Sequence, residues 1–217
     1  MKSGRSGPGY RLVGAAGALA AGLFIALFRF RRLGPVDFWA WLTANIVILV
    51  VLGFVLDRDY RARLAEDRRS GLLMKVTVGI VSAAALYAVF AVGRAVAPLI
   101  FPFAKAGIGS VYALKAGTPI LRVALLLGLV IGPGEELFWR GFFQERVAGT
   151  TRPAVGFVLT ILLYTAVHLA SGNIMLVLAA AVCGLFWGWL YLAFRSPILN
   201  AVSHTVWDLL VFVFLPF

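Results

Sequence analysis

The sequence predicts an all-α membrane protein, a polytopic bundle of about seven transmembrane helices. Of its 217 residues, 62% are hydrophobic and 13% are charged, whereas soluble domains are roughly 45–50% apolar and about 25% charged. The apolar runs have the length of membrane-spanning helices and lack the alternation of barrel strands. The net charge of +11 comes mainly from basic residues between these runs. It therefore indicates membrane topology and contact with anionic lipid, and we expect no nucleic-acid partner.

Seven apolar runs follow one another along the chain. They cover residues 12–28, 36–56, 72–93, 119–143, 154–170, 174–194 and 197–215. The first run resembles a signal peptide, but it continues well past the possible cleavage site at 18–20, so we expect a retained helix. Residues 94–118 contain glycines, prolines and scattered lysines. We expect this segment to lie along the interface or to re-enter the membrane.

The polar segments between the runs predict the topology. Residues 57–69 form the one strongly charged loop, and we expect its acids, like Glu145 near a later turn, to be solvated. Twelve lysines and arginines fall on the side of the N-terminus and seven on the opposite side. Because basic loops stay in the cytoplasm, this bias predicts a cytoplasmic N-terminus. The single cysteine, Cys183, lies in an apolar run and is expected to be a packed thiol.

A few ionisable side chains of catalytic type lie inside the apolar runs. They are Glu135, Glu136, His168, His204 and Asp208, with Arg140 beside the two glutamates. A charge at the bilayer centre costs about 2.5–3.5 kcal/mol on insertion scales. Each of these residues therefore indicates a functional site or a buried partner.

Helical spacing divides the charges of the fourth run. Glu136 and Arg140 are four residues apart and share a helix face, while Glu135 points about 100° away. We therefore expect a Glu136–Arg140 ion pair and a free Glu135. The preceding Gly-Pro-Gly at 132–134 predicts either a plain kink or a restarted helix whose first turn favours carboxylates.

The same reasoning places the histidines. Glu135 and His168 are equidistant from the turn at 150–153, so an antiparallel helix pair would bring them to the same height. His204 and Asp208, four residues apart, share a face of the last helix. At 1.5 Å per residue, all four groups are expected at one depth.

These embedded residues form three motifs in chain order. They are Glu135-Glu136-x-x-x-Arg140, Tyr164-x-x-x-His168 and His204-x-x-x-Asp208. In this order on three apolar helices, they resemble the CPBP family of intramembrane proteases. That family includes the type II CAAX prenyl endopeptidases and bacterial relatives linked to bacteriocin processing and immunity. The resemblance covers about 135–208 and implies a catalytic helical core at 119–217, preceded by transmembrane helices and the charged loop in 1–118.

The resemblance also implies roles for the four residues. Glu135 would activate a water for attack on a peptide carbonyl, with His168 assisting. His204 and Asp208 would hold the oxyanion or position the water. A general base and oxyanion donors are what this chemistry requires.

Two positions depart from the family's usual pattern. Tyr164 replaces Phe and adds a hydroxyl that needs a partner or could join the site. Asp208 replaces the commoner Asn, and because an ionised Asp cannot donate to an oxyanion, we expect it to orient His204. Glu136 and Arg140 would be supporting structure.

The sequence leaves the cofactor open. Glu135, His168, His204 and Asp208 could together bind Zn²⁺ with a water in the open position, but HExxH is absent and the ligands would come from three helices. We favour metal-free, glutamic-type catalysis and commit to no cofactor.

We therefore expect an endopeptidase that acts on a membrane-associated protein or peptide within the lipid bilayer. The alternatives are a proton-coupled transporter that uses the embedded carboxylates as a relay, or a non-catalytic immunity or scaffold protein. A composition rich in Arg, Ala and Gly favours a bacterial inner membrane.

Overall fold

The computed structural model describes residues 10–217, which form helices joined by short turns, with no β-strand among them. The predicted all-α bundle is thereby confirmed. The basic residues Lys2 and Arg5, which contribute to the predicted orientation, lie outside the described residues.

Six helices of the described part are long and apolar enough to cross a membrane. They are α1 (Tyr10–Phe30), α2 (Phe38–Leu56), α4 (Leu72–Ile100), α9 (Pro153–His168), α10 (Ile174–Phe194) and α11 (Pro197–Leu209). The spans of α9 and α11 continue to Ser171 and Phe214. Their outer faces expose large apolar side chains such as Leu73 and Leu99, as lipid-facing helices require. The chain is therefore an integral, multi-pass membrane protein.

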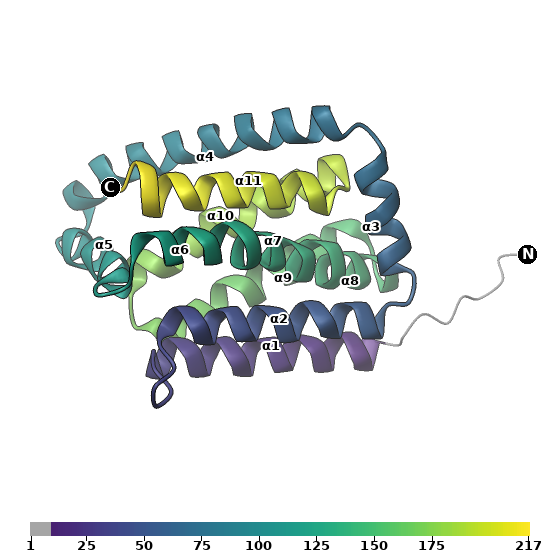
Figure 1. The fold of residues 1–217 in the computed structure, drawn as a ribbon, viewed down its shortest axis with the longest axis horizontal. Coiled ribbons are helices and arrows are strands. Elements are labelled where there is room, and N and C mark those ends of the chain that lie inside the picture. The colour runs from purple at the N-terminus through teal and green to yellow at the C-terminus, as the bar shows by residue number, and fades with distance from the viewer. Residues whose placement is uncertain (1–9) are drawn as a thin grey trace, which may run out of the picture.

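The remaining predicted span, at residues 119–143, is a helical rod with two wider turns. It consists of α6 (Ile120–Leu126), α7 (Gly132–Glu136) and α8 (Glu145–Thr150), joined by π-helical turns at Leu127–Ile131 and Leu137–Gln144. The rod is bent by 94° against the preceding segment 104–115. That segment, α5 (Ala104–Tyr112) and the turn Ala113–Lys115, lies at one end of the bundle (Figure 1).

The Gly-Pro-Gly sequence neither ends nor restarts the rod. Gly132 keeps helical dihedrals (φ −54°, ψ −54°), and its N–H bonds to the carbonyl of Leu127, five residues back, so the π turn carries the helix past Pro133. A Cβ on Gly134 would overlap Ile46, and a Cβ on Gly132 would lie 3.0 Å from the Thr205 hydroxyl. The glycines therefore let α2 and α11 pack closely against the rod.

The charged segment after α2 differs from the prediction. Residues 60–69 form a helix, α3 (Tyr60–Arg69), which runs across the end of the bundle opposite α5 (Figure 1). The Asp57 side chain is fully buried, with ion pairs to Arg63 and Arg146, each of 2.6 Å. The expectation of solvated acids was therefore wrong for Asp57. Its partner Arg146 lies in α8, far along the chain, so the local sequence around Asp57 does not indicate this ion pair.

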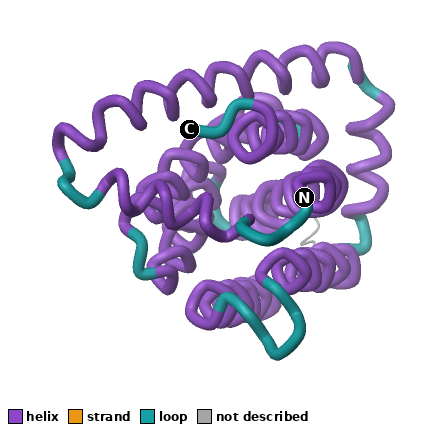
Figure 2. The backbone as a smooth tube through the Cα atoms, turned by 60° about the vertical axis from the view of Figure 1, so that its left-hand side comes forward, coloured by secondary structure: helices purple, strands orange, loops and turns teal. Residues whose placement is uncertain are grey.

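The connection made by α3 is visible from a second side. Figure 2 shows the long helix α4 along one edge of the bundle, with α3 leading to it from α2. Asp67 of α3 accepts a hydrogen bond from Ser196, at the start of α11. The segments around Asp57, Arg146 and Ser196 thus meet at one end of the bundle. All three belong to the side that the basic-residue count assigns to the N-terminus.

Candidate active site

The site begins with two adjacent carboxylates on α7 that have different surroundings. Glu136 is fully buried, and its carboxylate accepts from Arg140 Nη1 at 2.7 Å, from His204 Nδ1 at 2.8 Å and from Asn200 Nδ2 at 3.0 Å. The predicted pair with Arg140 is confirmed. Three donors from two helices make Glu136 the centre of a polar core between the rod and α11.

Arg140 is held without further polar partners. Its side chain is fully buried, and its Nε and Nη2 make no hydrogen bond among the described residues. The guanidinium carbon lies 5.0 Å from the ring centroid of Tyr164 and 5.7 Å from that of Trp187. These aromatic faces, together with Glu136, stabilise the buried cation.

Glu135, by contrast, has one hydrogen-bond partner. The hydroxyl of Tyr164 donates to Glu135 Oε2 over 3.0 Å, which gives the extra hydroxyl at position 164 the partner that it needs. The other carboxylate oxygen is engaged by no described side chain. That oxygen is therefore available to a water or a substrate.

The hydrogen bond of His168 fixes its tautomer. Nδ1 lies 2.7 Å from the backbone carbonyl oxygen of Tyr164, one turn earlier on α9. Because a carbonyl can only accept, Nδ1 carries the proton, and a neutral ring keeps its lone pair on Nε2. His168 thus has an acceptor in a ring that lines the same cavity as Glu135.

His204 is held from three directions. Nδ1 bonds to Glu136, and Nε2 lies 3.6 Å from Asp208 Oδ2, an ionic contact that is too long for a hydrogen bond. The indole of Trp187 stacks on the imidazole, with the ring centroids 3.7 Å apart and the planes at 21°. The ring has little freedom to rotate, so Nε2 has a fixed direction.

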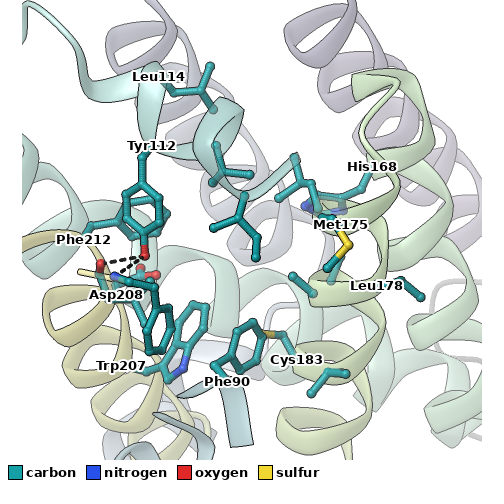
Figure 3. Close-up of a pocket in the computed structure, with 18 of the residues that line it drawn as sticks. Phe90, Tyr112, Leu114, His168, Met175, Leu178, Cys183, Trp207, Asp208 and Phe212 are labelled. Atoms are coloured by element: carbon teal, nitrogen blue, oxygen red, sulfur yellow. Dashed lines mark hydrogen bonds between the residues drawn. The ribbon is translucent and has the colours of Figure 1, made fainter. Parts of the chain in front are cut away.

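The four predicted residues line one cavity of about 390 Å³, which is otherwise mostly apolar. Glu135, His168, His204 and Asp208 all contribute to its wall, while Glu136 and Arg140 do not. Figure 3 shows His168 on one side of the cavity and Asp208 on the other, with Cys183 and Trp207 below. All four sequence-predicted residues therefore line one cavity, and the supporting pair Glu136–Arg140 lies outside its wall, in contact with the site through His204.

The donor set does not fit a zinc site. Within residues 10–217, no group of three or more His, Cys, Asp or Glu side chains lies close enough together to hold one metal ion. We therefore derive no step through a metal.

Two residues of the site were missed from the sequence. Asn200 is fully buried and bonds to Glu136 and to the Trp187 carbonyl, at 2.8 Å in the second case. Its spacing of four residues before His204 was a usable signal, because it places an amide on the same face of an apolar helix. Nothing in the spacing identifies Trp187, which reaches His204 from another helix.

Comparison with known proteins agrees with the motifs. Residues 117–210, less than half of the chain, match the family described as Rce1-like, type II CAAX prenyl endopeptidase. Searches among curated proteins and among solved structures found no match. The match confirms the resemblance predicted from the three motifs and covers Glu135, His168, His204 and Asp208. It supports a membrane protease whose substrates are membrane-associated.

Proposed function

We propose that this chain is an intramembrane endopeptidase of the glutamic type, in which Glu135 activates the attacking water. One observation carries the proposal. Glu135 faces a cavity that also contains two histidines and a second carboxylate, whereas the adjacent Glu136 is fully occupied by structural partners. Adjacent carboxylates with such different surroundings suit one catalytic and one supporting role.

Hydrolysis begins with a water held by the free oxygen of Glu135. Glu135 takes a proton from this water while the water oxygen bonds to the peptide carbonyl carbon. Tyr164, which donates to Oε2, keeps the carboxylate oriented. His168 Nε2 accepts a hydrogen bond from the second O–H of the water, which stays intact, and so directs the lone pair of the water toward the carbonyl.

The tetrahedral intermediate then carries a negative oxygen. In its protonated form, His204 donates Nδ1–H to Glu136 and has Nε2–H available for this oxyanion. Asp208 orients the ring from the Nε2 side. When the C–N bond breaks, Glu135 returns its proton to the leaving amine and is regenerated.

The surroundings of the cavity favour a lipid-embedded peptide as substrate. Apolar side chains form most of the wall, among them Phe24 of α1, Phe90 of α4 and Leu178 of α10. We further propose a bacterial inner membrane, with the α3 end of the bundle in the cytoplasm, since most loop arginines and lysines lie at that end.

The test compares terminal peptides of the membrane proteome in cells with the wild-type protein, Glu135→Ala or His168→Ala. We expect new termini with the wild type and none with either variant. Glu145→Gln is the matched control, because Glu145 bonds to Tyr191 and Arg195 at the end of the rod and lies outside the cavity. Wild-type termini in cells with folded Glu135→Ala would overturn the proposal.

A further inference from the structure

The helix α3 makes hydrogen bonds to the rod and to α11, two of the three helices that carry the proposed catalytic side chains. It crosses the end of the bundle opposite α5 (Figure 1), outside the cavity wall. We infer that α3 sets the position of the rod relative to α11, and that Tyr60 is a positioning residue for the reaction. This inference rests on the proposed function.

The first tie joins Tyr60 to the rod. Tyr60 is 1% exposed, and its hydroxyl donates to the carbonyl oxygen of Leu137 over 2.6 Å. Leu137 directly follows Glu136 and opens the π-helical turn. Because that turn has a widened hydrogen-bond pattern, a fixed external donor at its first carbonyl holds the backbone beside both glutamates.

Gly141 makes this contact possible. A Cβ on Gly141 would overlap the Tyr60 hydroxyl and would lie 3.1 Å from Cγ of Pro197. The glycine that follows Arg140 therefore admits the phenol of α3 to the surface of the rod. No larger residue fits there while Tyr60 keeps its hydrogen bond.

The second tie joins α3 to α11. Asp67 Oδ2 accepts from Ser196 Oγ at 2.9 Å and from the N–H of Ile198 at 3.1 Å. These are groups of the N-cap and first turn of α11, the helix that carries His204 further on. Lys75 of α4 pairs with the same carboxylate, at 2.5 Å, so Asp67 is itself fixed.

The third tie links α3 to α8, the C-terminal part of the rod. The buried Asp57 pairs with Arg63 of α3 and with Arg146 of α8. α3 thus contacts the first residue of the second π turn, is linked through Asp57 to α8 beyond that turn, and contacts α11 at its start. The gap between Glu135 and His204 is set by two helices whose ends are held by one short helix.

If α3 positions the catalytic groups, loss of one of its contacts should lower kcat and leave KM unchanged. Neither Tyr60 nor Asp67 lines the cavity, so loss of a tie leaves substrate binding intact and shifts the catalytic groups. Misplacement of about 1 Å at a reacting centre can cost about a hundredfold in rate. For removal of one hydroxyl we expect a fall in kcat of about tenfold, with KM unchanged within about twofold.

The experiment uses the full chain in liposomes with a cleaved membrane peptide. Tyr60→Phe removes only the donor, and Tyr191→Phe is the matched control. Tyr191 is 3% exposed at the same end of the bundle and donates to Glu145 at 2.9 Å. We expect Tyr191→Phe to keep wild-type kcat and KM.

A second pair of variants tests the contact itself. Gly141→Ala should lower kcat, because its methyl group displaces the Tyr60 hydroxyl. Adding Tyr60→Phe to Gly141→Ala should restore part of the loss, since removal of the hydroxyl makes room for the methyl group. This partial recovery is not expected if each residue only contributes packing.

The outcomes separate this inference from the proposed function. The role of α3 would be overturned if Tyr60→Phe kept the wild-type kcat, or if its KM rose by the same factor as its kcat fell. It would also be overturned if the losses of Gly141→Ala and Tyr60→Phe were additive in the double variant. Glu135→Gln is measured in the same series. Cleavage by Glu135→Gln would overturn the proposed function, whereas cleavage at the wild-type rate by Tyr60→Phe alone leaves that function intact.

Discussion

Replacing Glu136 by Gln removes the negative charge from the polar core while keeping the shape of the side chain. The wild-type carboxylate accepts from Arg140, His204 and Asn200. A glutamine has one acceptor oxygen and one NH₂ group, so it cannot satisfy three donors. The fully buried Arg140 then has no counter-ion among the described residues.

The size of the effect follows from this loss. Removing one partner of a buried ion pair costs about 3–5 kcal/mol, because the remaining charge stays desolvated. A typical protein is stable by about 5–15 kcal/mol. We therefore expect Glu136→Gln to lose a large part of the free energy of unfolding.

Unfolding in detergent, followed by circular dichroism against a denaturant, measures the difference. Glu135→Gln is the control, because its amide oxygen can still accept from Tyr164 and its change should stay within about 1 kcal/mol. Equal stability of the two variants would refute the division into a catalytic and a structural glutamate.

Three further predictions concern other groups. Asn200→Ala should lower stability by roughly 1–3 kcal/mol in the same unfolding assay, because Glu136 loses a buried donor; an unchanged unfolding curve would contradict the assigned contact. A membrane-permeant maleimide that alkylates Cys183, which lines the cavity, should block cleavage, while Cys183→Ala should keep its activity after treatment; an alkylated but active wild type would place the reaction elsewhere. For Asp57, burial raises the pKa and its ion pairs with two arginines lower it, with a net value below the usual range. Its contribution to stability is therefore present above about pH 4 and is lost as pH falls through the lowered folded-state pKa. Asp57→Asn should flatten this acid dependence, and an unchanged slope below about pH 4 would count against the buried ion pairs.

Helical spacing and apolar length predicted most of the bundle, and the four embedded residues that the sequence indicates line one cavity. Charges four residues apart identified the pair Glu136–Arg140, because that relation depends on one helix only. The hydrogen bond from His204 to Glu136 could not be predicted in this way. It depends on the register between the rod and α11, which no local pattern specifies.

The segment 57–69 shows the same limit. Its density of charge indicates a solvated loop, yet Asp57 is buried because Arg146, far along the chain, lies beside it. The two π-helical turns were also not predicted. Nothing in their sequences distinguishes them from other helical turns, and the second turn accompanies close packing of Tyr60 against Gly141.

The most direct test of the central claim is the rate of peptide cleavage by Glu135→Gln in liposomes, beside the wild type. Gln keeps the size of the side chain and an acceptor for Tyr164, but it cannot take a proton from water. Loss of a general base typically costs about 10²–10⁴ in rate. We predict a fall of at least about a hundredfold in a variant that unfolds like the wild type. Cleavage at the wild-type rate would contradict the assignment of Glu135 as the base.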